Sequence, residues 1–188
     1  AVLAENPRVP SARTGPVKTE KIALPLVLMA VFIVHMGALG NDFFWDDRPS
    51  ILEGHHVESL RHLPELFMHE FWYNVDLGER LPFAVVDTYR PMLNASFLFD
   101  NLLYRLQPAG FHLMNLVIHL ANVLLVFALA SRLLSAANAL LAAALFGLHP
   151  LASEPIHYVS ARADSLMILF TLASGWILFR RTPVSYLS

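Results

Sequence analysis

The sequence contains no cysteine and few charged residues. None of its 188 residues is Cys, and only 15% are Asp, Glu, Lys or Arg. The absence of cysteine excludes a disulfide framework, a thiolate metal site and a cysteine nucleophile, and it leaves the redox compartment open. No phosphate-binding loop, dinucleotide fingerprint, serine nucleophile elbow or basic nucleic-acid patch is present either. We therefore expect neither a nucleotide-binding enzyme of those types nor a nucleic-acid partner.

Apolar residues make up 56% of the chain, which is more than an average soluble domain contains. We expect an all-α polytopic membrane protein with about four transmembrane helices in one domain. The apolar runs that predict these spans are residues 22–40, 111–130, 133–151 and 165–180. The third run is short for a hydrocarbon core of roughly 30 Å. It is expected to include Pro150 and Leu151 or to be enclosed by its neighbours.

The segments around the spans complete the predicted domain organisation. Residues 1–21 mix prolines with basic residues and show no apolar periodicity, which is typical of a flexible arm. We expect the membrane domain to cover 22–181, with outer loops at 41–110 and 152–164, and a tail at 182–188.

Basic residues next to the spans predict the orientation of the chain. By the positive-inside rule, the amino terminus should be cytoplasmic and both outer loops should lie on the opposite side. Membrane lipids are therefore expected partners. The basic residues at the predicted cytoplasmic ends are Arg8, Arg13, Lys18, Lys21, Arg132, Arg180 and Arg181.

Two stretches of the first outer loop have the spacing of amphipathic helices. Residues 57–71 and 91–106 each place leucines and phenylalanines on one helical face, with polar residues between them. Pro91 suits the first turn of such a helix. We expect two helices that lie along the membrane interface.

An acidic pair follows the first span. Asp46 and Asp47 lie in a Trp-Asp-Asp-Arg run at the membrane surface. A carboxylate in that place can accept the proton of an attacking hydroxyl, or bind a divalent cation as cofactor. The same residues could instead cap a helix that starts near Pro49, or simply solvate a loop. We take Asp46 and Asp47 as candidate catalytic residues.

A second polar cluster lies in and beside the shorter outer loop. Glu154 and His157 are spaced to share a helical face, while Arg162 and Asp164 suit a phosphate and a metal or polar substrate. A polar hairpin among lipid headgroups would have the same composition. Arg90, at the start of the second interfacial helix, suits a phosphate headgroup or ordinary lipid. All five are candidate substrate-binding residues.

A polar stripe runs along the second span. In hydrocarbon such a stripe should face protein or a cavity, and interhelical hydrogen bonding explains it more often than ligand binding does. Its members follow helical spacing at His112, Asn115, His119 and Asn122.

Several of these motifs occur in the order of a known family. They are Trp45-Asp46-Asp47, Glu70-Phe71-Trp72, Tyr89-Arg90-Pro91, Pro108 to His112, Asn115 with His119, and His149-Pro150 through Glu154 to Asp164. This set resembles the amino-terminal half of the transmembrane and tetratricopeptide-repeat O-mannosyltransferase-like proteins and of their bacterial relatives, within the GT-C glycosyltransferases. The resemblance covers about residues 22 to 180. It departs at Ala152 from a His-Pro-x-His pattern of the relatives.

The resemblance implies a transferase that takes a sugar from a polyprenyl-phosphate carrier. The acid beside the acceptor hydroxyl would be Asp46 or Asp47. Glu154 and Asp164 would line the same cavity from the second outer loop. The resemblance also implies the inner membrane of a bacterium, with the large loop in the periplasm.

The resemblance leaves two functions from different classes open. In a GT-C-like glycosyltransferase, or part of one, a lipid-linked sugar donor would be the partner, and Arg90 or Arg162 would meet its phosphate. In a non-catalytic integral membrane subunit, the same half-fold would scaffold other membrane subunits. Further spans encoded beyond Ser188 would favour the enzyme, and their absence would favour the scaffold.

Overall fold

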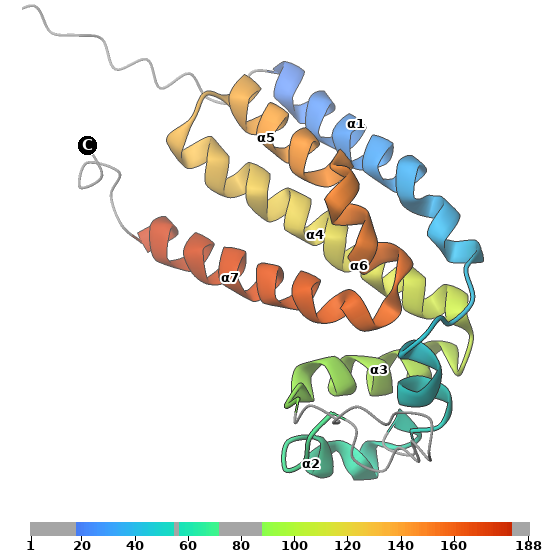
Figure 1. Cartoon of the computed structure of the whole chain (residues 1–188). Helices are drawn as coiled ribbons and strands as arrows, with labels where there is room; N and C mark the ends of the chain where they lie inside the picture. The colour runs from blue at the N-terminus through green and yellow to red at the C-terminus, as the bar shows by residue number, and fades with distance from the viewer. Residues whose placement is uncertain (1–17, 55–56, 72–87, 182–188) are drawn as a thin grey trace, which may run out of the picture.

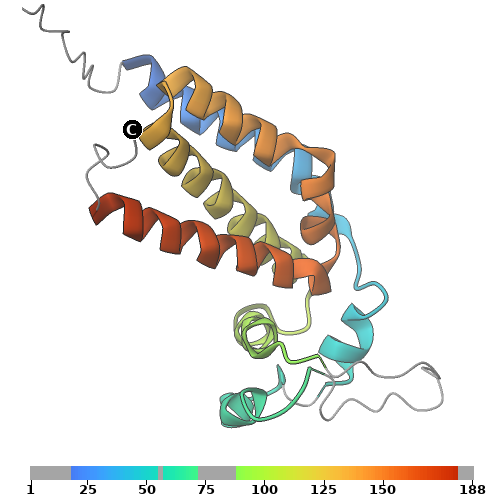
Figure 2. The same cartoon turned by 60° about the vertical axis from the view of Figure 1, so that its left-hand side comes forward.

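The computed structural model describes residues 18–54, 57–71 and 88–181, and these are helical or irregular with no strand. Four long helices form a bundle: α1 (Lys18–His35), α4 (Pro108–Leu133), α5 (Ala136–Leu148) and α7 (Arg162–Arg181). Helix α4 lies between α5 and α7 in both views, and α1 packs against α5 and α4 (Figures 1 and 2). Helix α4 is therefore the centre of the bundle.

Three stretches of the described chain are long and apolar enough to cross a membrane: Ile22–Gly40, Pro108–Leu133 and Val159–Arg180. A fourth crossing exists if Ala136–Leu148 and Pro150–His157 count as one span, which bends by 58° at its break. The break coincides with Pro150, which has no backbone N–H to continue a helix. The chain is an all-α integral membrane protein.

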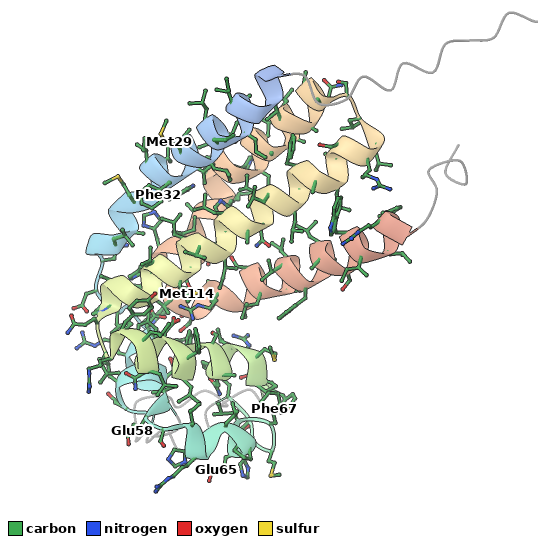
Figure 3. The ribbon with its side chains drawn as sticks, turned by 180° about the vertical axis from the view of Figure 1, so that it is seen from behind. Met29, Phe32, Glu58, Glu65, Phe67 and Met114 are labelled. Carbon is green, nitrogen blue, oxygen red and sulfur yellow. The ribbon has the colours of Figure 1, made fainter. Side chains whose placement is uncertain are left out.

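The outside of the bundle is apolar and its inside is packed through small residues. Met29 and Phe32 point away from the other helices on α1 (Figure 3), which suits contact with lipid. On α5, Gly147 is buried, and a Cβ atom built there would lie 2.6 Å from Cγ2 of Val31 and 2.9 Å from Cγ2 of Val123. Helices α1 and α4 can approach α5 only because that position has no side chain.

A second layer lies beyond the amino-terminal ends of α4 and α7 (Figures 1 and 2). It contains η2 (Arg48–Leu52), η4 (Leu60–His62), α2 (Leu63–Leu66) and α3 (Pro91–Tyr104). Its core is a buried apolar cluster of Phe43, Ile51, Val57, Phe71, Leu93, Phe97, Phe111 and Val159. Because the last two belong to α4 and to the second outer loop, the same core fastens this layer to the bundle.

The remaining described elements are short connections. They are η1 (Met36–Gly40), η6 (Pro150–Ser153), α6 (Glu154–His157) and η7 (Val159–Ala161). The last three carry the chain from α5 to α7.

The structure confirms one of the two helices expected in the first outer loop and corrects the other. Helix α3 begins at Pro91 as predicted and ends at Tyr104. The helix expected over 57–71 is instead the turn η4 followed by the single turn α2. Pro64 explains the correction, because it cannot bond to the carbonyl four residues back and its ring clashes with that carbonyl. The helical turn therefore restarts beside Pro64.

Candidate functional site

Asp47 is completely buried and joins the two outer loops. Its carboxylate accepts hydrogen bonds from the backbone N–H of Phe44 at 3.2 Å and of Val159 at 3.3 Å. Ser160 donates two more, from its N–H at 2.7 Å and from its hydroxyl at 2.6 Å. Four donors satisfy the oxygens of this anion, which is what a buried carboxylate requires.

Asp46, the residue before Asp47, is only partly buried and meets Tyr158. Burial is the main reason that the pKa of Tyr158 is raised well above its usual value, and the charges of Asp46 and Asp47 raise it further. The phenol therefore stays protonated beside Asp46. The two adjacent acids thus occupy different environments, one sealed and one accessible.

Arg162 is also completely buried, at the start of α7. Its guanidinium forms an ion pair with Asp100 of α3 at 2.6 Å. Its other contacts are hydrogen bonds to Asn115 Oδ1, to Ser96 Oγ at 3.0 Å and to the Phe111 carbonyl at 2.9 Å, and the face of the Phe97 ring at 5.1 Å. These contacts hold α3, α4 and α7 together. We call the contacts around Asp47 and around Arg162 the outer joint.

Asp100 is a buried acid that sequence reasoning missed. Burial raises its pKa to about 6, and this effect outweighs the attraction and hydrogen bond of Arg162, which lower the pKa. A signal for it exists, because Asp100 follows Leu93 and Phe97 at helical spacing on the apolar face of α3. An acid on such a face needs a buried partner. Ser160, by contrast, has no feature in the sequence that distinguishes it.

The polar stripe of α4 is buried and bonds to backbone carbonyls. His112 Nδ1 lies 3.0 Å from the Ile156 carbonyl, and His119 Nε2 lies 3.1 Å from that of Gly147. Asn115 and Asn122 donate to the carbonyls of Pro155 and Ser165 at 2.8 and 3.0 Å. The expectation of interhelical hydrogen bonding is confirmed. The side chains of His112, Asn115 and His119 bond to carbonyls at or beyond the break of the α5–α6 span, and Asn122 bonds to a carbonyl of α7.

The candidate substrate-binding residues lie in separate places. Arg90 is exposed, lies over the Phe71 ring at 5.8 Å, and lines a groove of about 260 Å³ between α3 and α7. Glu154 and Asp164 line a different cavity of about 540 Å³ among α4, α5, α6 and α7, here called the bundle cavity. His157 is exposed, and Asn41 Nδ2 lies 3.2 Å from its Nδ1.

The structure therefore brings Glu154 and Asp164 together, while the acids of the first loop line neither the groove nor the bundle cavity. A metal centre is not assembled either: among the described residues, no group of three or more His, Cys, Asp or Glu could hold a metal ion.

These features define an all-α integral membrane protein with a helical outer layer, whose two outer loops are joined through a buried acid. The chain is similar to the protein O-mannosyl-transferases Tmtc1 of Drosophila melanogaster and TMTC3 of Mus musculus. It is 34% identical to the first over 136 residues and 32% identical to the second over 150 residues, which is 71% and 79% of this chain. It is also 31% identical to protein O-mannosyl-transferase TMTC4 of Homo sapiens over 166 residues, or 79% of this chain.

These matches cover 15%, 16% and 22% of the three relatives, so the chain spans less than a quarter of their length. No family model and no solved structure matches the chain.

Proposed function

We propose that the chain is part of a GT-C-like membrane glycosyltransferase that moves a sugar from a polyprenyl-phosphate carrier to a hydroxyl acceptor. The names of the relatives support a sugar transferase. The observation that carries the proposal is the contrast between the acids of the first loop. Asp46 stays accessible, while Asp47 beside it is sealed and holds the loop in place. A general base has to contact the hydroxyl from which it takes the proton.

Asp46 is the proposed general base. Its carboxylate takes the proton of the acceptor hydroxyl as the hydroxyl oxygen attacks the anomeric carbon of the sugar. The bond from that carbon to the phosphate oxygen breaks, and the phosphate leaves with the bonding electron pair. Asp47 is less suited to this role because its oxygens already accept four hydrogen bonds. We assign it the positioning of Asp46.

Arg90 is the residue proposed to meet the donor phosphate. It is exposed at the first turn of α3 and borders an apolar groove, an arrangement that suits a phosphate attached to an isoprenoid chain. A cation in that place would stabilise the leaving phosphate. Arg162 does not suit the role, because its guanidinium is buried and paired with Asp100.

The other candidates keep proposed substrate-binding roles in the second outer loop. His157 is exposed beside the first loop, and Glu154 and Asp164 border the bundle cavity. The proposal includes a bacterial inner membrane, with a cytoplasmic amino terminus and a periplasmic large loop. The orientation is supported by the basic residues, which gather at the opposite ends of the spans.

A non-catalytic membrane subunit is the second candidate function. It is favoured by the complete engagement of Asp47 and Arg162 in internal contacts. A scaffold derived from a transferase would keep these two residues for its own folding. It would have no use for an accessible acid at position 46.

The test is transfer of radiolabelled mannose from polyprenyl-phosphate mannose by the native-length protein, reconstituted in vesicles. Asp46→Asn should lower the rate by ~10²- to 10⁴-fold, because an amide cannot accept the hydroxyl proton. The matched control is Asp42→Asn, the same change at an exposed acid of the same loop, which should keep the rate. Wild-type transfer by a correctly inserted Asp46→Asn protein would refute the base assignment. Absence of transfer by the wild type would favour the scaffold.

A further inference from the structure

The bundle cavity is lined by a buried hydrogen-bond acceptor that has no partner in the part of the chain that the structure describes. Asn122 lines the cavity and is only 1% exposed. Its side-chain nitrogen donates to the Ser165 carbonyl at 3.0 Å, which fixes the orientation of the amide. Its Oδ1 has no hydrogen-bond partner among the described residues. A buried acceptor left unpaired is unfavourable, so Oδ1 is a group that a ligand can satisfy.

The walls and the outer end of the cavity have different chemistry. Leu145, Phe146 and Ile168 supply apolar wall on α5 and α7. Glu154 and Asp164 border the same cavity and are both exposed, so they mark its solvent-facing end. The lining also includes the imidazoles of His119 and His149 and the hydroxyl of Ser165. A volume of about 540 Å³ that combines apolar walls with a set of polar groups is typical of a small-molecule site.

The charge of this lining selects against phosphate. Two carboxylates border the cavity, and none of the described residues that line it is Lys or Arg. An anion would be repelled there, and it would find no guanidinium or ammonium to pair with. The bundle cavity therefore differs in the charge of its lining from the Arg90 groove. That groove lies on the other side of the amino-terminal end of α7.

The deep acceptor selects against a cation. An ammonium could pair with Glu154 or Asp164 at the outer end. The same charge placed beside Asn122, within the span of α4, would meet no counter-charge and would pay a large desolvation cost. A hydroxyl is neutral and donates a hydrogen bond, so it can satisfy Asn122 without that cost.

We propose that the bundle cavity binds an uncharged, hydroxyl-bearing group of an amphiphile, such as the sugar of a neutral glycolipid. Its hydroxyls donate to Asn122 Oδ1 inside and to the carboxylates of Glu154 and Asp164 at the outer end. Its apolar part lies against the leucine, phenylalanine and isoleucine walls. The inference deepens the proposed function, and it rests on that function only in identifying the bound group as a substrate.

The experiment is photo-crosslinking of the native-length protein in phosphatidylcholine nanodiscs. The probe is an alkyl glucoside with a diazirine in its alkyl chain, and the comparison probe has the same chain with a phosphate in place of the sugar. The glucoside should label peptides that contain Phe146 or Ile168 saturably, and at least tenfold more than the phosphate probe does.

Two variants test the site. Ile168→Trp fills the cavity without touching its hydrogen bonds, and its matched control is Ile177→Trp on the exposed face of the same helix. Asn122→Leu removes the unpaired acceptor. Ile168→Trp and Asn122→Leu should each lower saturable labelling about tenfold, and Ile177→Trp should not. If Asn122→Leu fails to fold, the labelling of Ile168→Trp alone tests the proposal.

Non-saturable labelling, equal labelling by the phosphate probe, or full labelling of Ile168→Trp would each overturn the proposal. The readout needs no transfer reaction. A protein that binds the glucoside but transfers no sugar would keep this site and lose the proposed function. A protein that transfers sugar but does not bind the glucoside would keep the proposed function and lose the site.

Discussion

The outer joint and the bundle cavity both bury polar side chains, but Asp47 and Arg162 of the joint are saturated whereas Asn122 of the cavity is not. Asp100, also in the joint, has the Arg162 ion pair and no further hydrogen-bond donor for its carboxylate among the described residues. In the joint, Asp47 has four donors and Arg162 has an anion and three further acceptors. In the cavity, Asn122 keeps one oxygen without a partner. A saturated buried group stabilises a fold, whereas an unsaturated one is a cost that a ligand can remove. The comparison separates motif residues that build the protein from those available for binding.

The largest predicted effect comes from breaking the joint at Arg162. Arg162→Met should destabilise the protein by about 3–5 kcal/mol, because it removes the counter-ion of buried Asp100 and the donor to Asn115, Ser96 and the Phe111 carbonyl. Thermal unfolding in detergent measures the loss. The control is Arg90→Met, which removes an exposed guanidinium and should change stability by about 0.5 kcal/mol or less.

A double variant sharpens this prediction. Arg162→Met combined with Asp100→Leu replaces both charges with apolar groups, and such replacements are often neutral or stabilising. The double variant should therefore be more stable than Arg162→Met alone. Equal instability of the two proteins would mean that the ion pair is not the reason for the loss.

The fold was predictable where contacts are local. Apolar runs predicted the spans, and helical spacing with Pro91 predicted α3 within two residues of its observed end. The polar stripe on α4 predicted its own hydrogen bonding, because polar groups in hydrocarbon need partners. Pro64 already contained the signal that no continuous helix could cover 57–71. The spacing of apolar residues outweighed that signal in our prediction.

The site was predictable in residue type and only partly in arrangement. Asp47 and Ser160 lie 113 residues apart, and no local pattern pairs them. The pairing of Arg162 with Asp100 likewise depends on how α3 docks under α7. The sequence therefore indicated that Asp47 and Arg162 matter, but it did not indicate their partners. Tertiary contacts between distant segments decide which charged side chains are buried in internal contacts.

A smaller effect is expected in the bundle behind the cavity, where α1, α4 and α5 meet at Gly147. Gly147→Ala should cost about 1–3 kcal/mol, because the added methyl overlaps Val31 and Val123. Gly37→Ala is the control, since nothing lies within 4 Å of a Cβ atom there. Unfolding temperatures of the two proteins compare them. Val31→Ala in the Gly147→Ala background should recover stability, because it removes one of the overlapping side chains. If stability is not recovered, the overlap with Val31 is not the reason for the loss.

The measurement that tests the central claim most directly is the unfolding temperature of Asp46→Asn beside that of Asp47→Asn. The two variants make the same change at adjacent positions, one accessible and one sealed. Asp47→Asn turns an acceptor oxygen into a donor facing N–H groups and should cost about 1–3 kcal/mol. Asp46→Asn should leave the free energy of unfolding within about 0.5 kcal/mol of the wild-type value. Its unfolding temperature should therefore be nearly unchanged. Equal losses, or a larger loss for Asp46→Asn, would contradict the division of the acidic pair into a structural and an available residue.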